Sequence, residues 1–165
     1  MAKGFFTQGI AILLKKNVVM DELCEYLVPY KIAKRGEASN DRQFSGPYLV
    51  VEYRPEVNGF VSIDVVGNKW PDHMGDPKQE PTLFAAWGMG YLGPYAYPYG
   101  LRRSCEQSWR WDGAKAAVGM HNAFLRLRLS YIFGKNENAP VMPTDCDAEH
   151  ELRFLTRLIQ VLLEH

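Results

Sequence analysis

Apolar and polar residues alternate most clearly in the middle of the chain, where they predict an antiparallel hairpin. Two strand-like runs, 47–54 and 59–66, are joined through the sequence PEVNG, which contains the Asn-Gly signal of a tight turn. In the second run Val61, Ile63 and Val65 share one face, whereas Ser62 and Asp64 share the other. This pattern predicts a hairpin with one buried and one solvated face.

Similar runs predict strands over 4–15 and 124–133, and a weaker strand over 30–34. In the run 124–133, leucines alternate with Arg126 and Arg128, so we expect these arginines on the solvent face, paired with acids on neighbouring strands. Polar or Pro- and Gly-rich composition predicts irregular segments at 37–45, 68–81 and 136–143.

Helical spacing predicts helices over 21–27, 81–87, 101–109, 113–122 and 145–162. The last is amphipathic, with acidic residues and caps at its start, and its apolar stripe consists of Leu152, Leu155, Leu158, Ile159 and Leu162. Four to five mostly antiparallel strands with helices packed on the sheet define an α+β fold.

We expect a single domain over 1–162, because the chain shows no linker between folded units. Residues 163–165, with the sequence LEH, are typical of the junction to a histidine tag. The last helix has no glycine or asparagine cap after it. We therefore expect this chain to be the N-terminal part of a longer protein.

Composition narrows the class of protein. The chain has 165 residues, 47% of them apolar, with 19 basic and 19 acidic residues, which excludes wholesale disorder. The balanced charge argues against nucleic acid and anionic membranes as partners. Three distant cysteines, Cys24, Cys105 and Cys146, form no disulfide or CxxC pattern, and so favour the cytoplasm. The apolar run 9–14 is far shorter than the ~20 residues of a membrane span.

The loop 71–77 contains the best candidates for chemistry, Asp72, His73 and Asp76. Carboxylate and imidazole groups bind zinc or manganese, and a His–Asp pair can act as a general base. The alternative, which we favour, is a rigid turn between prolines in which the two carboxylates accept backbone hydrogen bonds. We accordingly expect no metal, no cofactor and no catalytic residue.

Aromatic residues make up 13% of the chain, and eight of them lie between Phe84 and Trp111 among many glycines and prolines. Rings in such a segment build either a core layer or a contact surface. Trp109 and Trp111, close to several arginines, would also suit nucleotide stacking, but the zero net charge argues against it. The acidic run 145–151 suits helix capping or, as a second interpretation, a basic partner.

Three motifs, RPEVNG at 54–59, WPDHMGDP at 70–77 and LFAAWGMG at 83–90, carry a resemblance. The chain resembles bacterial proteins encoded beside polymorphic toxins, including type VI secretion effectors, and regarded as their immunity proteins. The similarity extends from GFFTQG at 4–9 to the last helix. It implies a small cytoplasmic α+β protein that neutralises a cognate toxin by binding it, without catalysis.

On this interpretation we expect the toxin-binding surface where loop acids and aromatic residues lie close in sequence: Asp72, His73, Asp76, Trp87, Tyr91, Tyr95 and Tyr97. The alternative function is that of a small metal-dependent or acid–base hydrolase that uses Asp72, His73 and Asp76.

Overall fold

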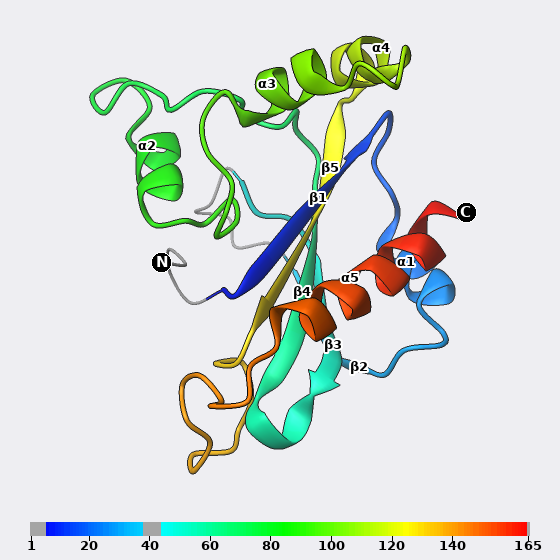
Figure 1. Cartoon of the computed structure of the whole chain (residues 1–165), viewed down its shortest axis with the longest axis vertical. Helices are drawn as coiled ribbons and strands as arrows, with labels where there is room; N and C mark the ends of the chain where they lie inside the picture. The colour runs from blue at the N-terminus through cyan, green and yellow to red at the C-terminus, as the bar shows by residue number, and fades with distance from the viewer. Residues whose placement is uncertain (1–5, 38–43, 165) are drawn as a thin grey trace.

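A five-stranded sheet with the strand order β1-β5-β4-β3-β2 forms the centre of the molecule (Figure 1). The structure is a computed structural model that describes residues 6–37 and 44–164. The strands are β1 Gln8–Leu14, β2 Ile32–Gly36, β3 Tyr48–Arg54, β4 Gly59–Val66 and β5 Ala123–Ser130. The helices are α1 Met20–Tyr26, α2 Pro81–Gly88, α3 Gly100–Gln107, α4 Ala114–Met120 and α5 Ala148–Leu163. All neighbouring strands pair antiparallel, so the predicted α+β fold is confirmed.

The predicted hairpin is formed by β3 and β4, which are joined by a short 3₁₀ turn at Pro55–Val57. Asn58 ends this turn with φ of 60°, a left-handed conformation that asparagine adopts more readily than most residues. The Asn58 side chain donates to the carbonyl of Asn136 at 2.8 Å and accepts from its amide at 2.9 Å. The turn is thereby tied to the loop that follows β5.

Helices α1 and α5 cover one face of the sheet, in front of it in Figure 1. The core there joins Leu23 of α1, Leu155 and Leu158 of α5, and the apolar residues of the three central strands, and these helix residues have no exposed surface. Pro29 follows α1 closely, as expected of a residue that ends a helix. Leu152 was predicted to belong to the same stripe but is 43% exposed, because it lies on the outward side of α5.

The second face of the sheet is also covered over β4, which corrects the prediction of a solvated face for this strand of the hairpin. The alternation along β4 is as predicted, but every residue from Val61 to Val66 is buried on one face or the other. The segment between β4 and α3 folds over β4 and β5, and its small core consists of Leu83, Trp87 and Leu92 with Trp70 against it. The segment 68–81 is irregular, as predicted, and largely exposed, and the buried core residues of the covering layer lie in 83–92.

Several boundaries differ from the prediction by a few residues. The strand predicted over 4–15 is β1, with 4 and 5 outside the described residues, as are 38–43 of the predicted loop 37–45. The strand predicted over 124–133 ends at Ser130. Helix α5 begins after Asp147, whose carboxylate accepts from the amides of Glu149 and His150, rather than at 145.

The edge strand β2 is short and irregular. A bulge interrupts its pairing with β3 between Ile32 and Lys34, and Ala33, Lys34 and Arg35 are exposed.

Candidate functional site

Asp72 lies in the loop 71–77 and serves as a helix cap. Its two carboxylate oxygens accept from the amides of Leu101 at 2.9 Å and Arg102 at 2.8 Å, at the start of α3. Its carbonyl accepts from the amide of Tyr99. The side chain thus satisfies amide groups that the first turn of a helix leaves without a partner.

Asp76 and His73 hold the same loop against α2. One oxygen of Asp76 accepts from the amides of Lys78 and Gln79, at 2.8 and 2.9 Å. The His73 ring is half exposed and lies 3.9 Å from the Glu80 carboxylate, and its carbonyl accepts from the indole of Trp87 at 2.7 Å. The three loop residues are therefore engaged in turns and caps. Within 6–37 and 44–164, no cluster of three His, Cys, Asp or Glu side chains is placed to hold a metal.

His121 is buried between backbone groups. Its Nε2 accepts from the amide of Trp70 at 3.0 Å, so the Nδ1 proton is directed to the carbonyl of Val118. With both nitrogens engaged, this imidazole has no free nitrogen with which to act as a general base.

The structure separates the aromatic residues of 84–111 into core and surface. Trp87 is buried, and Tyr91 is partly buried against the sheet. By contrast, five rings are exposed by 47–76%, and we call this set the aromatic surface: Tyr95, Tyr97, Tyr99, Trp109 and Trp111. Two of the seven predicted contact residues, Tyr95 and Tyr97, belong to it, and Tyr99, Trp109 and Trp111 were not predicted.

Helix α3, flanked by these rings, projects from the body of the protein. None of its residues is buried, and Ala114 is the one buried residue of α4. In Figure 1 both helices lie at the top, away from α1 and α5. These two helices bury little apolar surface. Hydrophobic packing, which normally holds a helix against a domain, therefore stabilises them only weakly.

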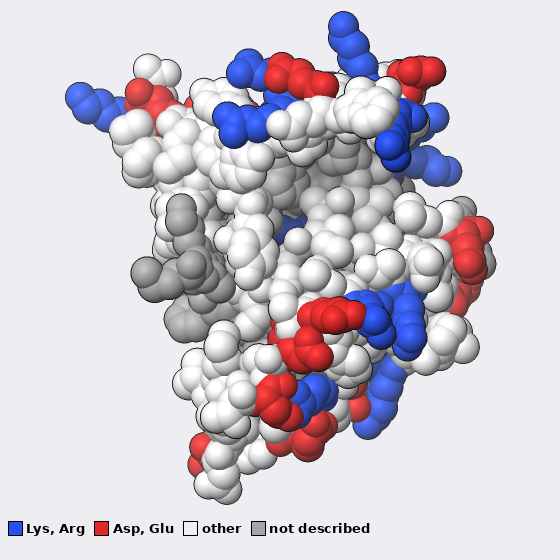
Figure 2. Space-filling view, viewed as in Figure 1, with Lys and Arg blue, Asp and Glu red and all other residues white. Residues whose placement is uncertain are grey.

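Arginines stack on three rings of the aromatic surface. The guanidinium carbons of Arg102, Arg103 and Arg110 lie 5.4, 5.7 and 4.6 Å from ring centroids of Tyr99, Tyr97 and Trp109, in that order. Such contacts keep both partners in defined positions at the surface. Figure 2 shows charged side chains gathered over α3 and α4 at the top and over α5 below, with a largely uncharged, hollowed region between.

Tyr99 holds a strained conformation at the start of α3, with φ of 65°. A bulky residue in the left-handed region costs on the order of 1–2 kcal/mol, and surrounding contacts must compensate. Asp72 provides such contacts, because its carbonyl accepts from the amide of Tyr99 and its carboxylate accepts from the amides of Leu101 and Arg102. A cleft of about 210 Å³ lies next to it, between α3 and β1, with Tyr95 and Tyr97 in its wall.

Arg126 and Arg128 are buried on the second face, which corrects the prediction that they lie on a solvent face. Their side chains are 1% and 5% exposed, and both donate to the same Asp64 oxygen, at 3.0 and 2.6 Å. Tyr91 lies over both guanidinium groups, and Phe6 lies over that of Arg128. The predicted pairing with an acid on a neighbouring strand is confirmed, because Asp64 is directly opposite Arg126 in the β4–β5 register.

This cluster holds two cations for one anion. Arg128 also donates to the Tyr91 carbonyl at 2.9 Å. However, Nη1 and Nη2 of Arg126 and Nε of Arg128 are buried and have no hydrogen-bond partner among the residues that the structure describes. Burial lowers the pKa of Arg126, and the carboxylate of Asp64 opposes that effect.

A groove of about 1020 Å³ runs over the second face beside this cluster. The described residues of its floor and walls come from β2, β3 and β4, from the chain between β2 and β3 (Glu37, Ser45 and Gly46), and from Tyr91, Arg128 and the chain after β5. Asp64 and Arg128 line the groove, so two residues of the buried charged cluster form part of its wall.

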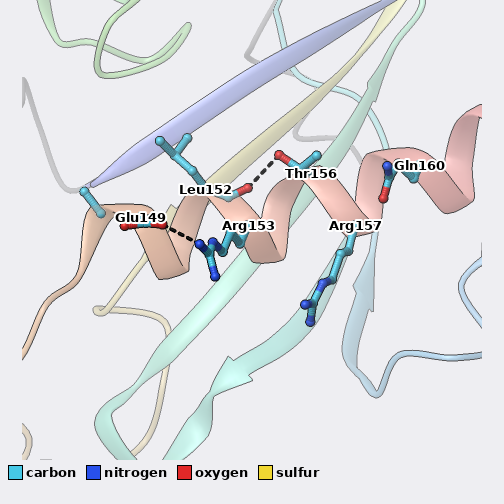
Figure 3. Close-up of a pocket in the computed structure, with 7 residues that line it drawn as sticks. Glu149, Leu152, Arg153, Thr156, Arg157 and Gln160 are labelled. Atoms are coloured by element: carbon cyan, nitrogen blue, oxygen red, sulfur yellow. Dashed lines mark hydrogen bonds and ion pairs between the residues drawn. The ribbon is translucent and has the colours of Figure 1, made fainter.

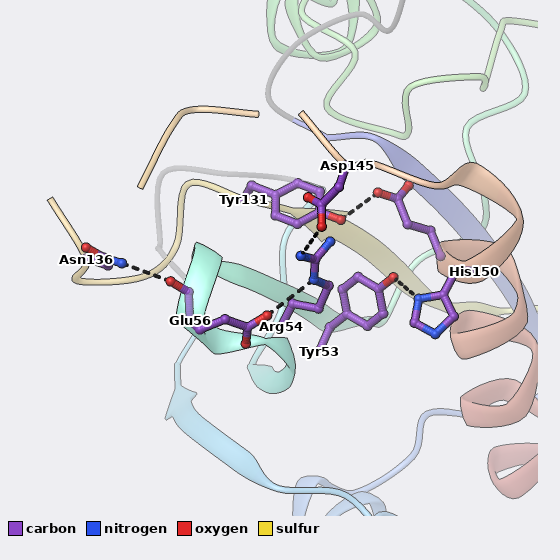
Figure 4. Close-up of polar contacts among 8 residues, drawn as sticks. Tyr53, Arg54, Glu56, Tyr131, Asn136, Asp145 and His150 are labelled. Atoms are coloured by element: carbon purple, nitrogen blue, oxygen red, sulfur yellow. Dashed lines mark hydrogen bonds and ion pairs between the residues drawn. The ribbon is translucent and has the colours of Figure 1, made fainter. Parts of the chain in front are cut away.

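The start of α5 is fastened to the sheet by a polar network (Figure 4). Tyr131 donates to buried Glu151 at 2.8 Å, and the hydroxyl of Tyr53 lies 2.8 Å from His150 Nδ1. Burial, followed by the bond to Glu151, raises the pKa of Tyr131 above its usual range. Asp145 accepts from Arg54 at 2.8 Å, and this bond lowers the pKa of the aspartate.

The acidic run 145–151 is thus matched within the protein. Asp145 pairs with Arg54, Asp147 caps α5, Glu149 pairs with Arg153, and Glu151 bonds to Tyr131. These contacts favour the capping interpretation over a surface for a basic partner.

The outward side of α5 carries a shallow hollow of about 550 Å³ lined by its own residues (Figure 3). There the Glu149–Arg153 pair and a bond from the hydroxyl of Thr156 to the carbonyl of Leu152 close on the helix itself. Both contacts lie within α5 and stabilise the helix itself. They do not direct polar groups into the hollow, as a ligand site would require.

Comparisons with family models, curated proteins and solved structures find no match to this chain. None of the helices in the described ranges has the length and apolar character needed to cross a bilayer.

Proposed function

We propose that this protein acts by binding another protein through its aromatic surface, and that the partner is a toxin that it neutralises. The exposed cluster of Tyr95, Tyr97, Tyr99, Trp109 and Trp111 is the observation that carries the proposal. Tyrosine, tryptophan and arginine are the residues most enriched among those that dominate binding energy at protein interfaces.

The stacked arginines support a partner with an acidic contact face. Between Tyr99 and Met120 the basic residues are Arg102, Arg103, Arg110 and Lys115, against Glu106 and Asp112. Oppositely charged faces accelerate association and fix the orientation of the partners. The toxin as partner comes from the resemblance of the sequence motifs to immunity proteins.

The proposed test uses the product of the neighbouring gene as the toxin. It is expressed in a bacterial host with and without this protein, and growth and direct binding are measured. The double variant Trp109→Ala/Trp111→Ala is expected to lose protection and to bind at least about 30-fold more weakly, since central aromatic residues contribute about 2 kcal/mol or more.

The matched control is Val141→Ala/Met142→Ala, which removes two exposed apolar side chains from the loop before α5. It should protect like the wild type. Full protection by the double tryptophan variant, with an unchanged circular dichroism spectrum, would refute the proposed surface. Binding of a single-stranded oligonucleotide that disappears in the same variant would instead indicate nucleic acid as the partner.

Asp72 and Asp76 both accept backbone hydrogen bonds, which supports binding over the hydrolase alternative. Metal analysis of the purified protein, with a pH profile of any hydrolytic activity in wild type and His73→Ala, tests that alternative. A bound metal with activity that His73→Ala removes would establish it.

A further inference from the structure

We infer that the groove on the second face of the sheet is a binding site for a small organic anion with a flat apolar body. This site is separate from the aromatic surface. It goes beyond the proposed function, because it concerns a small ligand rather than a protein partner.

The first observation is the uncompensated positive charge of the buried cluster. Arg126 and Arg128 share one carboxylate oxygen of Asp64. Among the described residues, Nε of Arg128 is buried without a hydrogen-bond partner, and so are Nη1 and Nη2 of Arg126, although Arg126 itself does not line the groove. Buried donors are nearly always satisfied in native proteins, and a charge away from water requires a counter-charge. An anion beside Arg128, which lines the groove, would supply the missing negative charge.

The second observation is the distribution of charge around the rest of the groove. Lys34 and Lys135 line it and are absent from the ion pairs formed among residues 6–37 and 44–164. Of its acids, Glu52 is paired with Lys31 at 2.9 Å and Asp64 with the arginines. Glu37 is the remaining acidic residue in the described lining. Lys34 and Lys135 therefore outnumber it among the charged groups outside the ion pairs, and Nζ of Lys34 also lies 5.7 Å from the ring centroid of Tyr48.

The third observation is the apolar part of the lining, which specifies the body of the ligand. Four aromatic rings line the groove: Tyr48, Phe60, Tyr91 and Phe133. A groove of about 1020 Å³ is large enough for a drug-sized molecule. Its aromatic lining with a few charged groups also fits such a ligand, because small-molecule sites combine apolar walls with a few precisely placed polar groups. An aromatic carboxylate or an aromatic phosphate ester has this combination.

The test is an amide NMR titration of the whole chain with four named probes. These are benzoate, phenyl phosphate, neutral benzamide and inorganic phosphate. We expect benzoate and phenyl phosphate to shift amide signals of Val50, Phe60 and Ser62, which lie along the groove. Benzamide, which keeps the ring and lacks the charge, should shift them at least about tenfold more weakly.

Reversing the charge of two lysines in the wall of the groove tests whether the anion binds there. Lys34→Glu/Lys135→Glu should weaken benzoate binding at least about tenfold, because like charges then face the ligand. The matched control Lys115→Glu reverses an exposed lysine of α4 and should bind like the wild type. Arg128→Lys should also weaken binding if it folds, and the wall variants keep the test decisive if it does not.

Any result of three kinds would overturn the inference. The first is the absence of shifts in the groove with both aromatic anions. The second is equal binding of benzoate and benzamide, or equal binding of benzoate by the double wall variant and the wild type. The third is binding of inorganic phosphate as tight as that of phenyl phosphate, since the apolar lining would then add nothing.

Discussion

Asp64 is the one carboxylate in a buried cluster with two arginines, so its removal should be among the most damaging single changes in the protein. The substitution Asp64→Asn preserves shape and leaves Arg126 and Arg128 buried without an anion. Breaking a buried pair by removing one partner costs about 3–5 kcal/mol, because it leaves an uncompensated charge. We expect a loss of that size in the free energy of unfolding.

The substitution Arg126→Met should behave differently, although Arg126 is equally buried. It leaves Asp64 and Arg128 as a one-to-one pair and removes the two terminal nitrogens that have no partner. The contact between Arg126 and the Tyr91 ring is lost, which costs up to about 2 kcal/mol for a desolvated pair. The net loss should therefore stay below about 2 kcal/mol.

Urea unfolding followed by tryptophan fluorescence measures both variants, since Trp87 is buried in the wild type. The double variant Asp64→Asn/Arg126→Met completes the cycle and should be more stable than Asp64→Asn alone. A loss for Arg126→Met equal to or larger than that for Asp64→Asn would refute the reasoning that the cluster has an excess cation.

Three further results are expected. Asp72→Ala should destabilise by about 1 kcal/mol, as loss of a cap does, with faster amide exchange at the start of α3 and no change in the sheet. Tyr131→Phe should cost about 1–3 kcal/mol in urea unfolding, because buried Glu151 loses its donor. The pKa of Asp145 is lowered by its bond to Arg54, so the unfolded state binds more protons. The pair stabilises the folded state above the unfolded pKa of ~3.9, and this contribution is lost as the pH falls from there through the lower pKa of the folded state. Asp145→Asn should therefore flatten the dependence of the unfolding free energy on pH in this acidic range.

The strands could be predicted largely because their signals are local. The hairpin β3–β4 follows from alternation on both sides of an Asn-Gly pair, and the helix α5 from its apolar stripe and acidic start. Burial of the second sheet face could not be predicted, since the segment that covers it has no periodic pattern and is placed by contacts distant in sequence. For this reason Arg126 and Arg128 resemble ordinary solvent-facing residues of a strand.

The candidate site shows the same limit. Asp72 was identified as a loop acid, but the amides that it caps lie 29 and 30 residues further along the chain. Likewise, nothing local distinguishes Trp87, which is buried, from Trp109, which is 76% exposed. Trp87 is buried because it packs in the small core with Leu83 and Leu92, whereas none of the residues of α3, which precedes Trp109, is buried.

The irregular shape of β2 has a consequence for how copies of the protein meet. An unpaired strand edge offers its backbone groups to any other strand, and long flat edges promote association. Here the outer strand is short, is bulged between Ile32 and Lys34, and carries the exposed, charged side chain of Arg35. A strand of a neighbouring molecule could not form a regular hydrogen-bond ladder with such an edge. This border of the sheet therefore protects the protein against edge-to-edge aggregation.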